Sequence, residues 1–128
     1  MHTREIERYV GIPYCAQSMD CADLVVLVQR ALFGREVRLP NGRPRGPRGQ
    51  AVLGDLSRSY GTPTDAPADG DLVLMQDRGR AGHVGVYFHL AGEGWVLHTS
   101  QVTGSSVLHR ARDLPDWGAP IVEIYRWA

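Results

Sequence analysis

The sequence predicts an α+β fold, in which N-terminal helices pack on a central antiparallel sheet of about five strands. A helix-like apolar stretch occupies residues 21–33, and from residue 71 onward apolar residues recur with the two-residue period of strands. The strand-like segments follow one another through short turns, which is typical of antiparallel pairing. With 128 residues and no internal repeat, the chain is expected to form a single domain, 1–128.

The stretch around Cys21 indicates a helix with defined ends. Asp20 is a suitable N-cap, because its carboxylate can accept hydrogen bonds from backbone N–H groups that lack a partner inside the helix. Gly34 follows as a C-terminal stop, and residues 24–33 are almost all apolar, which predicts a buried helix. Cys21 then occupies the first helical position, where the helix dipole stabilises a thiolate. The carboxylate of Asp20 acts in the opposite direction on the thiol pKa. The alternative interpretation is a small buried cysteine at the start of a core helix.

The charge balance and composition exclude several classes of protein. Fourteen basic side chains balance fourteen acidic ones, so the chain has no electrostatic preference for nucleic acid or an anionic membrane. No apolar run approaches the roughly 18 residues that a membrane span needs. The charged amino terminus, residues 1–8, does not resemble a signal peptide, so the protein is expected to be made in the cytoplasm. Cys15 and Cys21 form no disulfide framework, although a bond between them would occupy the thiol at the helix start.

The segments that flank this helix are predicted to be mostly irregular. Residues 3–10 can form a short helix, and residues 11–14 indicate a turn or an extended entry into the main helix. Residues 41–49 contain two prolines, three glycines and three arginines, which indicates an exposed loop. A basic lip that attracts an acidic polymer and an ordinary solvated loop are both compatible with that composition. Residues 50–60 are predicted to form a second helix, and residues 61–70 another loop.

Five segments carry the strand signal. They are rich in β-branched, aliphatic and aromatic residues, and a turn at residues 76–80 separates the first two. Because the helices precede the strands and do not alternate with them, the pattern favours an α+β protein over a parallel α/β fold. The predicted strands are 71–75, 83–88, 95–100, 107–110 and 121–127.

The connection between the second and third strands is short enough for a hairpin. A symmetric hairpin pairs Phe88 with Trp95 and places His83 and His98 on one face at diagonal positions. Gly85 leaves the space between the two imidazoles open. A slip of one residue would move His98 to the opposite face, so the pairing of the histidines depends on this register.

Cys21, His83 and His98 together supply the parts of a nucleophilic site. A thiol needs a base to take its proton, and the base needs a polar group that holds its ring. Two histidines and a distant cysteine without metal-ligand spacing make a metal site the weaker interpretation, so no metal and no cofactor are expected. Isolated sheet histidines are the alternative. His89 in the predicted loop and His109 on a later strand are predicted to lie at the surface.

Four motifs occur in a fixed order along the chain: Asp20-Cys21-Ala22-Asp23-Leu24-Val25, Gly70-Asp71-Leu72-Val73-Leu74, Gly82-His83-Val84-Gly85-Val86-Tyr87 and Val96-Leu97-His98-Thr99-Ser100. Over residues 9–127 their order and spacing resemble the NlpC-type cell-wall cysteine peptidases, compact papain-like enzymes that cleave peptides of bacterial peptidoglycan. Three further segments are similar to the branch found in phage tails and prophages: Gly11-Ile12-Pro13-Tyr14, Val37-Arg38-Leu39-Pro40 and Tyr125-Arg126.

The resemblance implies that Cys21 is the nucleophile, His83 the general base and His98 the residue that orients His83, in a papain-like fold. It also implies substrate contacts from Tyr14 and Asp20. The implied substrate is the peptide of peptidoglycan, and the implied partners are phage tail proteins. The expected place of action is the cell wall, within a phage tail or a similar assembly.

Two features depart from the family pattern. Many relatives have Ser-Gly after the cysteine where this chain has Ala22-Asp23, so a substrate contact from a serine is missing. No attached wall-binding domain is expected, so targeting would come from an assembly or a partner. Two alternatives therefore stay open: a structural tail-tip or secretion-machine component with weak or lost hydrolysis, and an amidase or acyltransferase that uses the same three residues.

Overall fold

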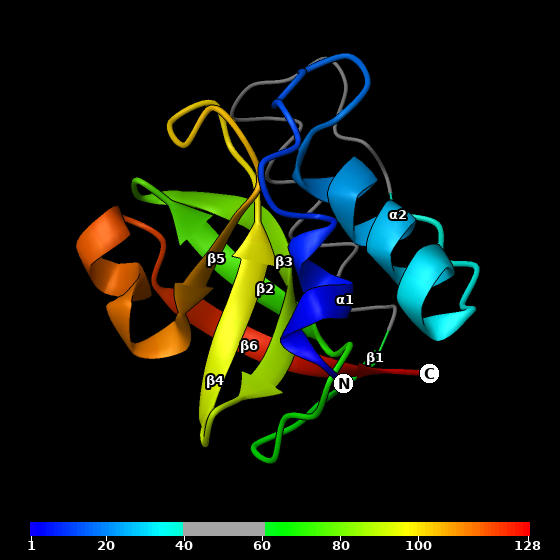
Figure 1. The fold of residues 1–128 in the computed structure, drawn as a ribbon. Helices are drawn as coiled ribbons and strands as arrows, with labels where there is room; N and C mark the ends of the chain where they lie inside the picture. Colours follow the sequence, from blue (N-terminus) through cyan, green and yellow to red (C-terminus); the bar gives the residue numbers. More distant parts are fainter. Residues whose placement is uncertain (40–60) are drawn as a thin grey trace.

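The structure is a computed structural model that describes residues 1–39 and 61–128. The predicted basic loop at 41–49 and the predicted helix at 50–60 lie outside the described residues. In chain order the described elements are α1 (Thr3–Glu7), α2 (Cys21–Phe33), β1 (Gly61–Pro63), β2 (Leu72–Asp77), β3 (Arg80–Leu90), β4 (Glu93–His98), β5 (Val107–Arg110), the 3-10 helix η1 (Ala111–Trp117) and β6 (Ile121–Trp127) (Figure 1).

The helix α2 begins and ends where the sequence predicts. Asp20 Oδ1 accepts a hydrogen bond from the backbone N–H of Asp23 at 2.8 Å, and Asp23 Oδ2 accepts one from the backbone N–H of Asp20 at 3.1 Å. At the other end Gly34 adopts the left-handed conformation with φ 61°, and its N–H donates to the carbonyl of Arg30. The reciprocal cap fixes Cys21 as the first residue of the helix.

The described strands form one antiparallel sheet with the order β1-β6-β2-β3-β4-β5. The α+β class is confirmed, and the sheet has six strands where about five were expected. The additional strand is β1, which pairs Thr62 with Arg126 of β6, so the prediction of a loop over all of residues 61–70 was wrong. A strand of three residues is too short to show a two-residue period, which explains the error.

The β3–β4 hairpin is tighter than predicted. Strand pairing continues through most of the predicted loop, so only Ala91 and Gly92 form the turn, and His89 lies in β3. Both turn residues have positive φ, 52° and 81°, as a two-residue hairpin turn requires. The predicted register is confirmed, because Phe88 lies opposite Trp95.

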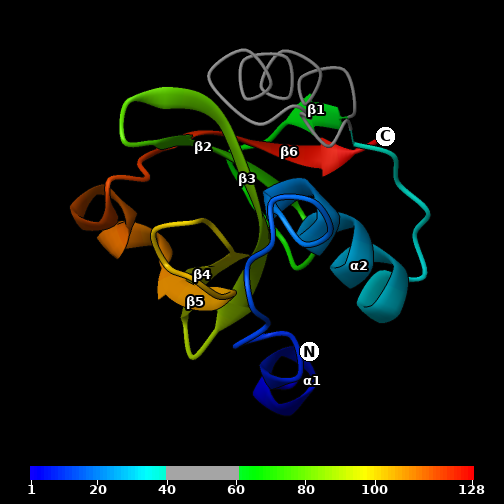
Figure 2. The same cartoon turned by 90° about the horizontal axis from the view of Figure 1, so that it is seen from above.

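The sheet is covered on both faces, by α2 on one and by η1 on the other (Figure 2). On the α2 side, the apolar core contains Leu24 and Val28 of the helix packed with Val84 and Phe88 of the sheet. On the η1 side, a smaller cluster surrounds Leu114 and includes the sheet residues Val73, Met75 and Val96. The alternation of side chains along β3 and β4 therefore sends neighbouring residues into two different cores.

The helix η1 was not recognised in the sequence. It is a 3-10 helix that contains Pro115, and Gly118 ends it with φ 71° in the left-handed region. One buried residue, Leu114, anchors it to the sheet. A single apolar anchor gives no helical period, so the sequence pattern could not indicate this element.

Candidate active site

Cys21 lies at the point where α2 meets the sheet. Its side chain is nearly buried, and the backbone N–H groups of Val84 and Ala22 donate to its sulfur. The Ala22 donor comes from the first turn of the helix, and the Val84 donor comes from β3. The predicted position of the thiol at the start of a buried helix is confirmed.

His83 and His98 are joined by a hydrogen bond. Nε2 of His83 lies 2.9 Å from Nδ1 of His98, and the two rings are nearly perpendicular, at 77°. Only 3% and 2% of the two residues are exposed, and the prediction that they share one face of the sheet is confirmed. Gly85 has a further packing role that the sequence did not indicate. A Cβ there would lie 2.7 Å from Val96 Cγ1 and 2.8 Å from Leu97 O, so glycine lets β3 approach β4 closely.

A third histidine, His109, continues this arrangement. Nε2 of His98 lies 3.0 Å from Nδ1 of His109, and the His109 ring stacks on Trp117 with 4.5 Å between centroids and 15° between planes. The prediction that His109 is a surface residue was wrong. The residue is only partly exposed, because β5 pairs it with Val96 of β4 and η1 covers that face. We call His83, His98 and His109 the histidine row.

One pocket of about 180 Å³ contains the predicted site residues Cys21 and His83. Tyr14 and Asp20, which were predicted to contact substrate, line it too. His98 lies behind His83 and is not among the lining residues. The pocket is completed by residues that the sequence analysis did not select, from the β2–β3 turn and from the segment after β4: Asp77, Arg78, Arg80, Thr99, Ser100 and Gln101.

Two details of this pocket concern its polar groups. Thr99 is fully buried, and within residues 1–39 and 61–128 its Oγ1 has no hydrogen-bond partner. The guanidinium of Arg78 lies 3.5 Å from Asp77 and is largely exposed.

A larger groove of about 990 Å³ lies between α1 and α2, but it contains neither Cys21 nor a member of the histidine row. The reactive groups therefore mark the smaller pocket as the candidate site.

Burial dominates the electrostatics of the thiol and the imidazole. It raises the pKa of Cys21 to about 11, although the two backbone hydrogen bonds to the sulfur lower this pKa. The carboxylates of Asp77 and Asp23 raise it further. Burial also lowers the pKa of His83 to about 4, although Asp77 acts in the opposite direction. Both groups are therefore neutral at rest. Burial therefore outweighs the expected thiolate-stabilising effect of the helix start.

Asp20 is 1% exposed, and its Oδ1 is engaged by the helix cap. Asp20 therefore lines the pocket, as the sequence predicted, and its carboxylate also caps the helix that begins with Cys21.

Three further findings concern cofactors, disulfides and membranes. Within the described part of the chain, no group of three or more His, Cys, Asp and Glu side chains is arranged to hold a metal ion. Cys15 and Cys21 are not joined by a disulfide. Among the described helices, none is both long enough and apolar enough to cross a membrane.

The chain matches the model of a known protein family. The model of the NlpC/P60 family matches residues 9–126, which is most of the chain and includes α2, the pocket and the histidine row. No curated protein matches the chain.

Proposed function

Since the chain belongs to the NlpC/P60 family, we propose that it is a cysteine peptidase that hydrolyses amide bonds in the stem peptides of peptidoglycan. Members of this family are typically cysteine peptidases or amidases that act on peptidoglycan. The observation that carries the proposal is that Cys21 and His83 line one pocket while His83 is hydrogen-bonded to His98. Residues 1–128 act in this proposal as one peptidase domain.

In the proposed reaction, the sulfur of Cys21 attacks the carbonyl carbon of the amide while His83 takes the thiol proton. The receiving atom is Nδ1 of His83, because Nε2 is bonded to His98. His83 then gives the proton to the leaving amine, the C–N bond breaks, and the acyl group remains on the sulfur as a thioester. Water that His83 deprotonates hydrolyses the thioester and restores the thiol.

The two backbone donors at the sulfur support this sequence of steps. As the proton leaves Cys21, the N–H groups of Val84 and Ala22 face the developing negative charge. Val84 follows His83 directly in β3, so one short segment supplies both the base and a donor to the thiolate. Because thiol and imidazole are neutral at rest, the ion pair forms only when the reaction begins.

The pocket walls are consistent with a peptide that carries carboxylates. Tyr14 and Asp20 are the proposed substrate contacts, and Arg78 and Arg80 add two cations next to them. Guanidinium groups bind carboxylates through paired hydrogen bonds, and the stem peptides of peptidoglycan contain free carboxylates.

We also propose that the protein acts at the cell wall as part of a phage tail or a similar assembly, with tail proteins as partners. Support for this comes from the sequence, where Gly11-Ile12-Pro13-Tyr14 and the closing Tyr125-Arg126 are similar to the tail-associated branch. Co-purification of the chain with assembled tails, and its loss when the tail is dissociated, would test this association.

Replacing the nucleophile tests the proposed activity directly. Cys21→Ala is expected to reduce lysis of purified cell walls by about ten-thousand-fold or more, because the thiol and its base act as a unit. The matched control is Cys15→Ala, which removes the other cysteine of the chain and should leave lysis unchanged. Cooperative thermal unfolding of both variants would show that the fold is intact. Lysis by folded Cys21→Ala would refute the peptidase function.

One observation favours the second candidate, a structural component with weak or lost hydrolysis: the Cys21 thiol is buried and its pKa is raised to about 11. Alkylation at neutral pH distinguishes the two functions, with Cys15 in the same chain as the internal reference. If Cys21 reacts faster than Cys15, a base is offsetting the raised pKa, as catalysis requires. If it reacts more slowly, the structural function is favoured. Mass spectrometry of the released muropeptides then separates a peptidase from an amidase or acyltransferase.

A further inference from the structure

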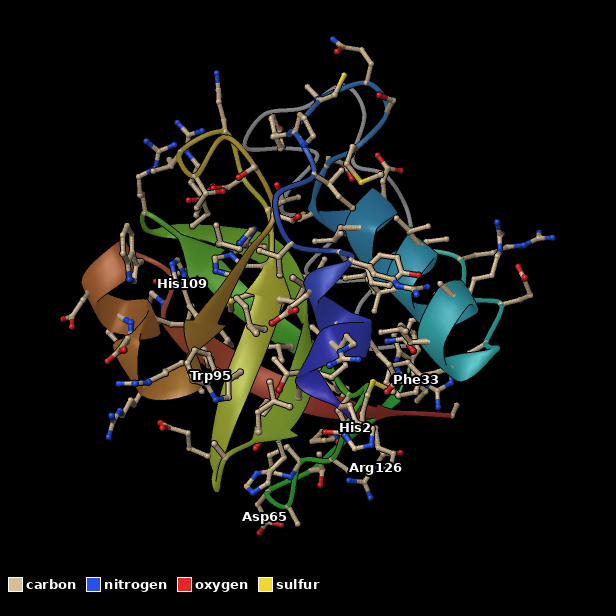
Figure 3. All side chains as sticks on the ribbon, viewed as in Figure 1. His2, Phe33, Asp65, Trp95, His109 and Arg126 are labelled. Atoms are coloured by element: carbon tan, nitrogen blue, oxygen red, sulfur yellow. The ribbon has the colours of Figure 1, made fainter. Side chains whose placement is uncertain are left out.

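The histidine row extends the candidate site beyond the base and its partner. His83, His98 and His109 come from β3, β4 and β5, and two hydrogen bonds of 2.9 and 3.0 Å join them end to end. Figure 3 places His109 at the side of the molecule where η1 lies, and its ring is stacked on Trp117. The inner two residues are nearly buried, whereas His109 is partly exposed and Trp117 is 56% exposed.

Counting protons along the row leaves only two neutral arrangements. A neutral imidazole has one N–H, and each hydrogen bond of the row needs one donor and one acceptor. In the first arrangement each ring carries its proton on Nε2, so that His83 donates to His98 and His98 donates to His109. In the second arrangement each ring carries its proton on Nδ1, and every bond runs in the opposite direction. Nδ1 of His83 can take the thiol proton only in the first arrangement.

The three positions differ in how readily they hold a positive charge. Burial lowers the pKa of His83 to about 4 and that of His98 to about 2, with the neighbouring imidazoles adding to the effect at His98. His109 is less buried, and although burial lowers its pKa, the carboxylate of Asp113 on η1 raises it. The charged groups that act on the two ends of the row are therefore Asp77 of β2, near His83, and Asp113 of η1, near His109. A proton is held most easily at the outer end.

On the premise of the proposed peptidase function, we propose that His109 is a positioning residue that sets the proton arrangement of the row and so keeps the base in its working tautomer. As an acceptor at Nδ1, His109 holds the proton of His98 on Nε2 and, through it, the proton of His83 on Nε2. When His83 takes the thiol proton at Nδ1, its Nε2 proton passes to His98 and the Nε2 proton of His98 passes to His109. The positive charge then lies at the exposed end, and the reverse transfers return a proton to the leaving amine.

The same arrangement predicts how acid inactivates the site. Protonated His109 carries N–H groups on both ring nitrogens, so its Nδ1 donates to His98 and drives the row into the second arrangement. Nδ1 of His83 is then already protonated and cannot act as a base. Activity should therefore fall as the pH drops through the pKa of His109, which lies below the ordinary value of 6.5.

Two substitutions separate acceptor function from packing. His109→Asn can place an amide oxygen near the position of Nδ1 but cannot be protonated, whereas His109→Leu offers neither acceptor nor donor. Both variants lose the stacked ring over Trp117 to the same extent, so each controls for the other.

Nuclear magnetic resonance of the ring nitrogens in the full chain tests the proton arrangement without reference to activity. In the unchanged protein and in His109→Asn, His83 and His98 are expected to carry their protons on Nε2 at neutral pH. In His109→Leu a measurable fraction of both should carry them on Nδ1. If the unchanged protein holds its protons on Nδ1, or if the two variants have the same tautomers, the proposal is overturned even when the protein proves to be a peptidase.

Kinetics provide the second readout. His109→Leu is expected to lower kcat for wall-peptide hydrolysis by about ten- to a hundredfold with KM nearly unchanged, by analogy with the loss found when the hydrogen-bond partner behind a metal-ligating histidine is removed. His109→Asn should retain most of kcat, and the acidic limb of its kcat/KM profile should move to lower pH. An acidic limb that stays in place in His109→Asn would contradict the proposed role. Absence of hydrolysis in the unchanged protein would refute the proposed function instead, and the ring-nitrogen spectra would still decide the arrangement of the row.

Discussion

The two sides of the sheet contribute different parts of the site. On the α2 side a single reactive group, Cys21, is placed by the end of a helix, and its position depends on local capping bonds between Asp20 and Asp23. On the η1 side three imidazoles are placed by strand register, and their positions depend on pairings between β3, β4 and β5. Local hydrogen bonds thus position Cys21, the proposed nucleophile, whereas strand pairing positions His83, the proposed base.

The two sides of the sheet also differ in how burial shifts the pKa of their reactive groups. Both sides are buried, but burial favours the protonated thiol on the α2 side and the unprotonated imidazole on the η1 side. Each group is thereby held in its neutral form, which is the form in which a thiol can give a proton and an imidazole can accept one. The same physical effect therefore prepares both partners for the proposed proton transfer.

On the η1 side, the largest expected effect comes from removing His83, the proposed base. His83→Ala should lower the rate of wall hydrolysis by about 10³- to 10⁴-fold, because without a proton acceptor the neutral thiol is a poor nucleophile. His98→Ala should cost less, since His98 orients His83 without touching the thiol. His98→Asn, which can keep an oxygen near Nδ1 of the original ring, should be milder still.

These three variants are compared by single-turnover hydrolysis of purified cell walls at one pH. Equal losses for His98→Ala and His98→Asn would show that the hydrogen bond to His83 has no role in the rate. A loss in His83→Ala no larger than in His98→Ala would remove the distinction between base and orienting residue.

Acid should destabilise the fold through the η1 side. The folded pKa values of His83 and His98, about 4 and about 2, lie below the ordinary value of 6.5, so the unfolded chain binds more protons below pH 6.5. Stability is complete above that pH and falls as the pH drops from 6.5 toward 4, by about 1.4 kcal/mol per pH unit for each histidine. Urea unfolding measured between pH 7 and pH 4.5 checks this slope, and His98→Asn should reduce it by about half.

Alkali should act through the α2 side in the opposite sense. Burial raises the folded pKa of Cys21 from 9.0 to about 11, so stability is complete below pH 9 and is lost as the pH rises from 9 toward 11. Cys21→Ala should abolish that alkaline loss while leaving the acidic slope unchanged. If Cys21→Ala alters the acidic slope, the two sides do not titrate independently.

Register on the η1 side depends on Gly85, and a smaller loss is expected there. Gly85→Ala places a Cβ against the carbonyl oxygen of Leu97 and the side chain of Val96, so unfolding free energy should fall by about 1–3 kcal/mol. Gly94→Ala is the control, because the atoms nearest to its Cβ would belong to the ring and hydroxyl of Tyr87 and not to the backbone of a neighbouring strand. Urea unfolding measures both variants. A loss in Gly94→Ala as large as in Gly85→Ala would show that the contact with β4 backbone is not decisive.

The comparison of the two sides also explains what the sequence could predict. The helix start, with Asp20 and Cys21, was predictable because capping residues act on neighbours three positions away. The shared face of His83 and His98 was predictable because a short connection favours a symmetric hairpin, which sets the register, although the turn itself is shorter than expected. His109 was not, since the segment between β4 and β5 has no turn signal that sets their register, and η1, which covers His109, shows no apolar period.

The electrostatics of the site were likewise beyond the sequence. A helix start predicts a lowered thiol pKa, and only the depth of burial shows that desolvation reverses the sign. The pocket residues Asp77, Arg78 and Arg80 lie at the β2–β3 turn, whose position relative to Cys21 depends on how α2 packs on β3. No spacing along the chain could bring them to Cys21.

The smallest expected effect is local to the α2 side, at the helix cap that positions Cys21. Asp20→Ala removes the acceptor for the backbone N–H of Asp23 and should lower the unfolding free energy by about 1 kcal/mol, whereas Asp20→Ser, which retains a capping oxygen, should lose less. Because this bond lies in the first turn of α2, the acidic slope set by the histidine row should not change. Urea unfolding at pH 7 and at pH 5 measures both quantities in each variant. An Asp20→Ser variant as unstable as Asp20→Ala would mean that the carboxylate stabilises the fold by some means other than capping, and a changed acidic slope would mean that the helix end and the strand register are coupled.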